Sequence, residues 1–228
     1  MPRIDALIFD LDGTLADSIA DIGAAMNAVL VELGLTPHDA NTYKTFVGEG
    51  AEHLVRRAVR AAQHLDWRVV DDGALPSSLV ELCEAYRQQY AKLEHQGSRP
   101  YEGIAEMLDG VVASGRRMAV LSNKRDDFTK HLVAQAFGRW KFVDVRGERE
   151  GVPRKPDPTA AFELALELNV LPERIGFVGD TPIDVKTAKA AGMISIAALW
   201  GFRSRDELER AGAAHFLERP ASLLQLLR

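Results

Sequence analysis

The sequence contains a single cysteine, Cys83, among its 228 residues, which excludes a framework of internal disulfides. No apolar run approaches the roughly 20 residues that span a membrane, and the first residues lack the basic and apolar regions of a signal peptide. Internal repeats and low-complexity tracts are also missing. We therefore expect a cytoplasmic protein without a membrane partner, in which Cys83 is a core thiol rather than a reactive one.

Positive charge is not in excess either. The 28 Lys and Arg residues and the 33 Asp and Glu residues give a net charge of −5 at pH 7, which does not favour nucleic acid as a partner. The remaining composition, 46% hydrophobic and 27% charged, is ordinary for a globular protein. The length suits one large domain, or a main domain with an insert. An anionic substrate would need a local cation to bind this chain.

The most informative stretch joins the apolar run Ala6–Phe9 to Asp10-Leu11-Asp12-Gly13-Thr14. The run predicts a parallel strand that is buried on both faces. Because residues i and i+2 of an extended chain point to the same side, Asp10 and Asp12 are expected to converge beyond the strand's carboxyl end, where open α/β sheets bind ligands. Two such carboxylates repel unless a cation or a shared proton relieves them, and Mg²⁺ is the economical choice. Alone, Asp12-Gly13 is equally a turn dipeptide.

The rest of the chain falls into two patterns. Helices without strands are expected over residues 17–33, 51–64 and 77–93, in a segment well placed to be a lid. From residue 99 strands alternate with helices, which implies right-handed crossovers and a doubly wound parallel sheet. The fold class is therefore α/β. The strands are expected at residues 118–121, 142–145, 175–178 and 194–198.

Polar residues follow two of these later strands and precede one helix. Ser122 and Asn123 follow the strand at 118–121, Lys155 precedes a helix, and Asp180 and Asp184 follow the strand at 175–178. If the strands are parallel, the strand ends marked by these residues lie on one edge of the sheet together with Asp10.

Each of these groups also has a purely structural interpretation. Ser122-Asn123 can merely begin a loop, and Lys155 can be a solvated charge in an extended link. Thr181-Pro182 is typical of a helix start, with Asp184 completing a capping box. Asp180 is harder to explain structurally, because the strand leaves its carboxylate at the ligand edge just before that cap.

Taken together, the groups are more specific. Asp10-x-Asp12-Gly13-Thr14, a Ser after a second strand, a Lys before a helix and Gly179-Asp180-Thr181-x-x-Asp184 resemble the four motifs of the haloacid dehalogenase (HAD) superfamily. The resemblance implies a Rossmann-like core, residues 1–15 and 97–228, with an inserted α-helical cap, residues 16–96. Within the superfamily the chain most resembles the phosphoglycolate phosphatase-like branch. The cues are Asp17-Ser18 after the first motif, Val47-Gly48-Glu49-Gly50-Ala51, and Leu121-Ser122-Asn123-Lys124.

The resemblance also implies roles. Asp10 would be the nucleophile that forms an aspartyl-phosphate, and Asp12 the acid and base that protonates the leaving alkoxide and then activates water. Dehalogenases lack the second acidic residue and phosphonoacetaldehyde hydrolases depart from this first motif, which disfavours both chemistries. Mg²⁺ would be held by Asp10, the backbone carbonyl of Asp12 and Asp180, with Asp184 nearby. The phosphoryl oxygens would be bound by Ser122 and Lys155, with Thr14 and Asn123 adding donors.

The cap is expected to choose the substrate. Lys44, Arg56 and Arg57 are the cationic candidates to meet a substrate carboxylate, although both arginines can equally lie on the solvated side of a helix. The expected partner is a small phosphorylated metabolite, with 2-phosphoglycolate as the best single candidate, bound by a monomer or homodimer.

Two alternatives remain open. A phosphomutase of the β-phosphoglucomutase type shares the four motifs, but it usually has a His soon after the first, and none lies between Asp12 and His38. A non-catalytic phosphate-binding protein would not require Asp10, Asp12, Lys155 and Asp180 all to be intact. The sequence therefore favours a phosphomonoester hydrolase.

Overall fold

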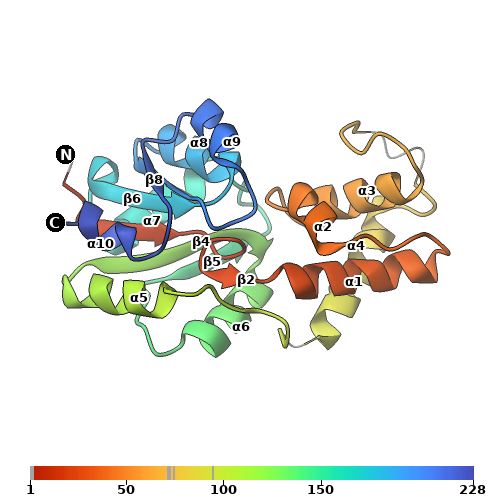
Figure 1. The fold of residues 1–228 in the computed structure, drawn as a ribbon, viewed down its shortest axis with the longest axis horizontal. Helices are drawn as coiled ribbons and strands as arrows, with labels where there is room; N and C mark the ends of the chain where they lie inside the picture. The colour runs from red at the N-terminus through yellow and green to blue at the C-terminus, as the bar shows by residue number, and fades with distance from the viewer. Residues whose placement is uncertain (1–2, 71–72, 74, 94) are drawn as a thin grey trace. The chain divides into compact units, whose positions relative to one another are not determined.

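The computed structural model describes residues 3–70, 73, 75–93 and 95–228. The chain divides into two compact units, which we call the sheet unit (Met1–Asp17 and Pro100–Arg228) and the helical unit (Ser18–Arg99) (Figure 1). Across the described ranges, no helix combines the length and the apolar character needed to cross a membrane.

The sheet unit is built on six strands in the order β5-β4-β1-β6-β7-β8, and every pairing is parallel. The first strand of the chain, β1, lies in the middle between β4 and β6, so the strand order reverses beside it (Figure 1). This is the predicted α/β doubly wound parallel sheet. The bounds are β1 (Ala6–Phe9), β4 (Arg117–Arg125), β5 (Val145–Glu148), β6 (Ile175–Gly179), β7 (Ile194–Ala198) and β8 (His215–Leu217).

Helices cover both faces of this sheet, because alternate residues of the fully buried β1 pack against different helices. Leu7 and Phe9 pack with α5 (Ile104–Ala113), α6 (Asp126–Phe137) and α10 (Ser222–Leu226). Ala6 and Ile8 point the other way and pack with α7 (Thr159–Leu168) and α8 (Pro182–Ala190). Each large apolar side chain buried in this way contributes about 1.5–3 kcal/mol. Two elements near the C-terminus complete the sheet unit: η1 (Pro172–Arg174) precedes β6, and α9 (Arg205–Ala211) packs on α8.

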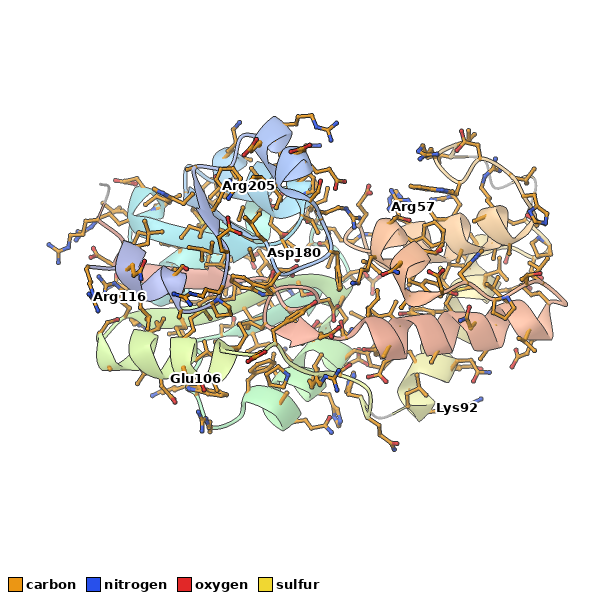
Figure 2. The ribbon with its side chains drawn as sticks, viewed as in Figure 1. Arg57, Lys92, Glu106, Arg116, Asp180 and Arg205 are labelled. Carbon is orange, nitrogen blue, oxygen red and sulfur yellow. The ribbon has the colours of Figure 1, made fainter. Side chains whose placement is uncertain are left out.

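The termini of the sheet unit are joined by one arginine. Arg116 (labelled in Figure 2) lies just before β4. It donates from Nε to the carbonyl of Ile4 at 2.8 Å and from a terminal nitrogen to the carbonyl of Leu227. A guanidinium carries five N–H donors in a fixed fork, so one side chain can satisfy two backbone carbonyls.

Two strands differ from their predicted bounds. The strand predicted at 118–121 continues to Arg125, so Ser122 and Asn123 lie within β4 and not in a loop. The strand predicted at 142–145 begins instead at Val145 and ends at Glu148. This strand, β5, pairs with β4 on one side and forms an edge of the sheet. Polar side chains at an edge reach solvent, so β5 lacks the apolar pattern that marks a central strand. The same reason explains why the short edge strand β8 was not predicted.

The helical unit contains four helices in its described part: α1 (Ile19–Glu32), α2 (Ala40–Phe46), α3 (Ala51–Ala62) and α4 (Leu79–Lys92). Local sequence signals set their starts. The Asp39 side chain accepts the N–H of Thr42 at the start of α2, and Ser78 with Glu81 forms a capping box at the start of α4. At the boundary with the sheet unit, β2 (Ala16–Asp17) and β3 (Arg99–Pro100) form a two-stranded sheet.

Candidate active site

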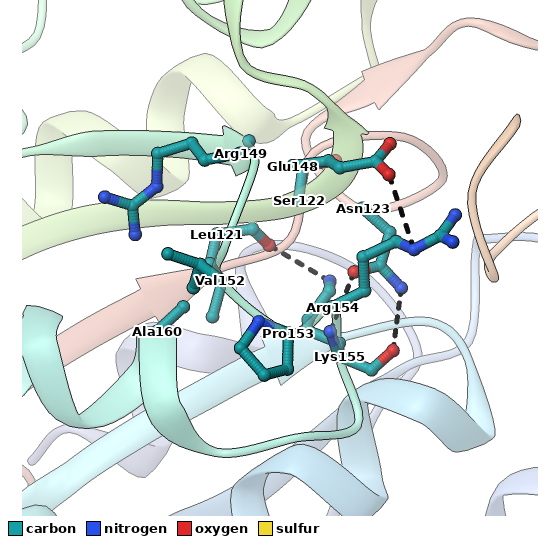
Figure 3. Close-up of a pocket in the computed structure, with 11 residues that line it drawn as sticks. Leu121, Ser122, Asn123, Glu148, Arg149, Val152, Pro153, Arg154, Lys155 and Ala160 are labelled. Carbon is teal, nitrogen blue, oxygen red and sulfur yellow. Dashed lines mark hydrogen bonds and ion pairs between the residues drawn. The ribbon is translucent and has the colours of Figure 1, made fainter.

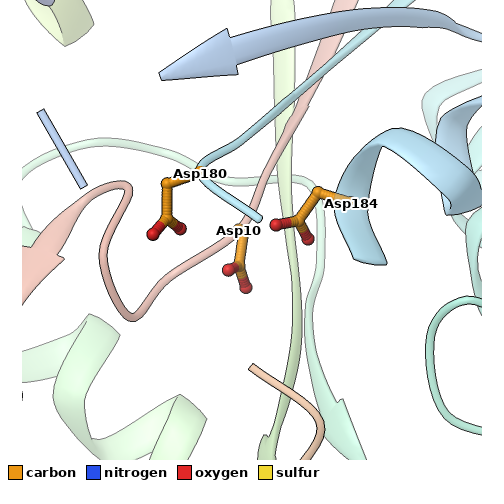
Figure 4. A group of neighbouring side chains, drawn as sticks. All are labelled: Asp10, Asp180 and Asp184. Carbon is orange, nitrogen blue, oxygen red and sulfur yellow. The ribbon is translucent and has the colours of Figure 1, made fainter. Parts of the chain in front are cut away.

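Three carboxylates meet at the carboxyl edge of the central strands. Asp10 directly follows β1, Asp180 directly follows β6, and Asp184 lies in the first turn of α8. One oxygen from each lies within 4.8 Å of the others (Figure 4). All three residues are buried, with exposed fractions of 7%, 0% and 2%. Because the strands are parallel, the ends of β1 and β6 lie at the same edge, as the sequence predicted.

Lys155 is the cation of this cluster. Its Nζ lies 2.8 Å from Asp10 Oδ1 and 2.7 Å from Asp184 Oδ1, and it also donates to the carbonyl of Leu121 at 3.0 Å. These three acceptors match the three N–H donors of an ammonium. The sequence placed Lys155 beside the carboxylates only through the family resemblance, and the fold brings it there from a loop before α7.

Asn123 holds the backbone of Lys155 in place. Its Oδ1 accepts the N–H of Lys155 at 2.9 Å, and its Nδ2 donates to the carbonyl of Lys155 at 3.0 Å (Figure 3). The sequence-based expectation was that Asn123 adds a donor for phosphate. In the structure its side-chain amide binds the chain that carries Lys155 and so fixes that lysine, and a donor for phosphate near Asn123 stays a prediction.

Asp184 both caps a helix and belongs to the carboxylate cluster, so both interpretations of its sequence position apply. Its Oδ2 accepts the N–H of Thr181 at 3.1 Å and the Thr181 hydroxyl at 2.7 Å, which is the predicted cap of α8. Its Oδ1 faces Lys155 in the carboxylate cluster. A Cβ on Gly179 would lie 2.3 Å from Asp184 Cβ, so this close approach requires a glycine.

Asp180 is held by two neutral donors. Its Oδ1 accepts the hydroxyl of Thr14 at 3.0 Å, and its Oδ2 accepts the N–H of Phe202 at 2.8 Å. The one hydroxyl proton of Thr14 is directed to Asp180, and the expected contribution of Thr14 to phosphate binding stays a prediction. Trp200 Nε1 donates to the carbonyl of Thr14 at 2.9 Å. The segment after β7 therefore supports the cluster.

The sequence reading missed this segment, Trp200 to Phe202. A signal was present, because the segment follows the strand predicted at 194–198, and parallel strands of one sheet end at the same edge. A Cβ on Gly201 would lie 2.2 Å from Asp180 Cβ, and one on Gly13 would lie 2.4 Å from Asp180 Oδ2. Glycines are thus needed on two sides of this carboxylate.

Asp12 lies outside the carboxylate cluster that the described residues form. Both of its carboxylate oxygens are 3.1 Å from Lys124 Nζ. Asp12 therefore has a cation of its own, and the expected convergence of the Asp10 and Asp12 side chains stays a prediction. Lys124 was not predicted as a site residue. It lies two residues after Ser122 in β4, but the strand was predicted to end at Leu121.

Ser122 is buried, with 4% exposure, and its Oγ accepts the N–H of Lys124 at 3.2 Å. A hydroxyl that accepts a hydrogen bond keeps its own O–H donor, so Ser122 retains the group that phosphate binding needs. A cavity of about 10 Å³ lies beside Ser122, Asn123 and Lys155, with Arg154 and Glu148 at its wall (Figure 3). That volume holds about one water molecule, so this cavity is not a metabolite pocket.

Burial and crowding perturb the cluster. Burial raises the pKa of Asp10 well above its usual range, Lys155 opposes this effect, and the Asp184 and Asp180 carboxylates add to it. Burial and the Asp184 carboxylate raise the pKa of Asp180 to about 7. For Lys155, burial alone would lower the pKa, but the Asp10 and Asp184 carboxylates outweigh it and the pKa is raised. The ammonium therefore stays charged.

The donor set fits a hard divalent cation. Three ionised carboxylates and one ammonium leave two negative charges at the cluster, and every carboxylate donor is an oxygen, the ligand type that Mg²⁺ prefers. Burial, and then the neighbouring carboxylates, raise the pKa values of Asp10 and Asp180, so ionising the cluster calls for added positive charge. A bound dication would supply it.

The predicted substrate-selecting residues lie in the helical unit. Lys44 is on α2 and Arg56 is on α3, and their role stays a prediction. The neighbouring Arg57 has a structural task, because it donates to the carbonyl of Phe46 at 2.9 Å and pairs with Glu49. Arg57 thereby fixes the segment that links α2 to α3.

Comparison with known proteins agrees with this geometry. The family model of haloacid dehalogenase-like hydrolases matches residues 7–198. A phosphoglycolate phosphatase of Rhodospirillum rubrum is 35% identical over 223 residues, which covers 98% of this chain and 90% of the relative.

Solved structures extend the comparison to the fold. A protein of Lactobacillus delbrueckii subsp. bulgaricus, provisionally assigned as a phosphoglycolate phosphatase, superposes with a TM-score of 0.90 at 27% identity, covering 99% of this chain and 98% of that one. CbbY of Rhodobacter sphaeroides, in complex with phosphate, superposes with a TM-score of 0.76 at 26% identity, covering 97% and 96%. The chain therefore belongs to the haloacid dehalogenase-like hydrolase family, in its phosphoglycolate phosphatase-like branch.

Proposed function

We propose that this phosphatase is a Mg²⁺-dependent phosphomonoester hydrolase that acts through an aspartyl-phosphate on a small phosphorylated metabolite. The observation that carries the proposal is the buried cluster of Asp10, Asp180 and Asp184 around Lys155 at the ligand edge of the sheet. Its charge suits a dication, and its lysine suits a phosphoryl group. The best single substrate is 2-phosphoglycolate, which the names of several relatives support.

In the first step, a carboxylate oxygen of Asp10 forms a bond to phosphorus while the bond from phosphorus to the substrate's alcohol oxygen breaks. Asp12, as a carboxylic acid, gives its proton to the departing alkoxide. In the second step, water attacks the phosphorus of the aspartyl-phosphate, the bond from phosphorus to the Asp10 oxygen breaks, and the Asp12 carboxylate takes a proton from that water. Inorganic phosphate leaves, and both aspartates return to their starting forms.

The other residues stabilise charge and geometry. Lys155 places a permanent positive charge beside Asp10, and the Ser122 hydroxyl supplies a donor at the same edge. The metal would be held by Asp10, Asp180 and the backbone carbonyl of Asp12, with Asp184 nearby. When bound, Mg²⁺ supplies charge neutralisation at the carboxylates and at the transferring phosphoryl group.

We further propose the helical unit as the cap that selects the substrate, in keeping with the insertion predicted over residues 16–96. Lys44 and Arg56 are its candidates for binding a substrate carboxylate, for which a cation is the complementary group. Replacing either by Met is expected to raise KM for 2-phosphoglycolate more than KM for a phosphate ester without a carboxylate. An equal effect on both esters would remove that residue from substrate selection.

The central test is phosphate release from a panel of phosphomonoesters, with and without Mg²⁺. The wild type should release phosphate only with Mg²⁺, and Asp10→Asn should abolish release, because an amide lacks the nucleophilic oxygen. Asp109→Asn is the matched control, since Asp109 is 60% exposed on α5 and pairs with Arg139. No release from any ester would contradict the proposal, and sugar phosphates with a bisphosphate primer would then test the mutase alternative.

A further inference from the structure

Asp12, the residue assigned to proton transfer, is held by a lysine that the four motifs do not include. Lys124 Nζ lies 3.1 Å from each carboxylate oxygen of Asp12. Equal contacts to both oxygens fix the plane of a carboxylate as well as its position, because rotation about the bond that carries it would break one of them.

The length of β4 brings the two residues together. Phe9 at the end of β1 is in register with Val120 of β4, and β4 continues to Arg125. Its last residues therefore run beside the loop that carries Asp12. The side chains of Lys124 and Asp12 are both shielded, with 8% and 17% exposure. A shielded ammonium needs acceptors close by, since leaving it without them is costly, and the Asp12 oxygens provide two.

The backbone of Lys124 is itself anchored. Its N–H donates to Ser122 Oγ at 3.2 Å, and its carbonyl accepts the hydroxyl of Thr129 at 3.0 Å. A Cβ on Gly147 would lie 2.4 Å from the same carbonyl, so β5 packs closely against it. The lysine therefore extends from a fixed point of the chain, which is what a residue that orients a neighbour requires.

We infer that Lys124 is a positioning residue for Asp12, holding its carboxylate where it exchanges protons with the leaving alkoxide and with water. The inference rests on the proposed hydrolase function and deepens it. Proton transfer depends on geometry first, within about 2.6–3.2 Å between heavy atoms. A carboxylate that rotates freely spends less time in that geometry, so losing Lys124 should act on the step that needs Asp12.

The test uses the chemistry of the leaving group. An alkoxide is strongly basic and needs the Asp12 proton to depart, whereas p-nitrophenolate departs without it. The value of kcat/KM covers the steps up to the departure of the alcohol. Lys124→Met should therefore lower kcat/KM for an alkyl phosphate such as 2-phosphoglycolate at least about tenfold more than kcat/KM for p-nitrophenyl phosphate. Lys124→Arg, which keeps the charge and the donors, should recover part of the loss on the alkyl ester.

A double-mutant cycle separates positioning from general disruption. If Lys124 acts through Asp12, adding Lys124→Met to Asp12→Asn should lower alkyl ester turnover no further than Asp12→Asn alone does. Lys130→Met is the matched control, because Lys130 also pairs with an aspartate, Asp126, at 2.7 Å but is 56% exposed on α6. The Lys130→Met variant should change kcat/KM for the alkyl ester and for p-nitrophenyl phosphate by the same factor.

Some outcomes would overturn the inference. One such outcome is an equal loss of kcat/KM for both esters. Another is a double variant whose loss of alkyl ester turnover equals the product of the two single losses. Either result would make Lys124 a merely structural residue. Circular dichroism shows whether Lys124→Met folds. If it does not, the same comparison of the two esters is made with Lys124→Gln. If the wild type itself released no phosphate from either ester, the proposed function would have failed, and the inference would fall with it.

Discussion

At the residue scale, Asn123 and the backbone of Lys155 are joined by a pair of hydrogen bonds, one in each direction. Both residues are about 6% exposed, so water does not readily replace a lost partner. The side chain of Asn123 thus makes the end of β4 a support for the lysine that pairs with both Asp10 and Asp184.

Asn123→Ala should destabilise the fold and reduce activity. It leaves the N–H and the carbonyl of Lys155 without these partners, and each buried polar group left unsatisfied costs about 1–3 kcal/mol. Urea unfolding measures the free energy, and phosphate release measures the rate. Asn41→Ala, at an exposed position of α2, is the control and should change the free energy of unfolding by less than about 0.5 kcal/mol. Unchanged stability and rate in Asn123→Ala would show that these bonds do not support the site.

At the element scale, the segment between β7 and α9 acts as a wall of the carboxylate cluster. Trp200 binds the carbonyl of Thr14, and the N–H of Phe202 binds Asp180. Contacts of this kind orient metal ligands, and their loss typically costs 10- to 100-fold in metal affinity or activity.

Gly201→Ala should therefore weaken Mg²⁺ binding. The new Cβ would lie 2.2 Å from Asp180 Cβ and 2.5 Å from the carbonyl oxygen of Gly13, and backbone on one side leaves little room to yield. We expect Mg²⁺ affinity, measured by calorimetry, to fall roughly 10- to 100-fold.

Gly110→Ala is the matched control for this substitution. Its Cβ would come as close, 2.5 Å, but to the flexible end of Leu224. It should lower stability without changing Mg²⁺ affinity. Equal Mg²⁺ affinities in wild type and Gly201→Ala would contradict a role of this segment in the metal site.

At the scale of the whole molecule, the charge of the cluster links folding to pH and to Mg²⁺. Asp180 has a pKa of about 7 in the folded protein, against an ordinary value of 3.8. The folded state then binds this proton more tightly than the unfolded state does. The stability that this proton contributes is complete below about pH 4 and is lost as pH rises through about 7.

Mg²⁺ should reverse that loss, because it binds the deprotonated carboxylates. At a concentration 100-fold above its Kd, a ligand adds about 2.7 kcal/mol, which raises the Tm of a chain of this size by roughly 5–10 °C. Thermal unfolding with EDTA or with Mg²⁺, at pH 5.5 and pH 7.5, measures the effect. The increase in Tm should be larger at pH 7.5, and an increase that is equal at both values, or no increase, would argue against these carboxylates as the metal ligands.

Much of the catalytic edge could be predicted from sequence, because its signals are local. The apolar run Ala6–Phe9 alone indicated a strand buried on both faces, and Thr181 with Asp184 alone indicated a cap at the start of α8. The order of strands and helices was enough for a doubly wound sheet, whose parallel strands place Asp10 and Asp180 at one edge.

The partners of the polar side chains were decided by the tertiary structure. Lys124 meets Asp12 because the register between β1 and β4 lets β4 extend past the first motif, and register depends on packing across the whole sheet. Thr14 and Phe202 meet at Asp180 because a loop from far along the chain returns to the first turn. Hydrophobic periodicity is written in neighbouring residues and can be read locally, whereas a hydrogen bond between residues over a hundred positions apart exists only once the chain has folded.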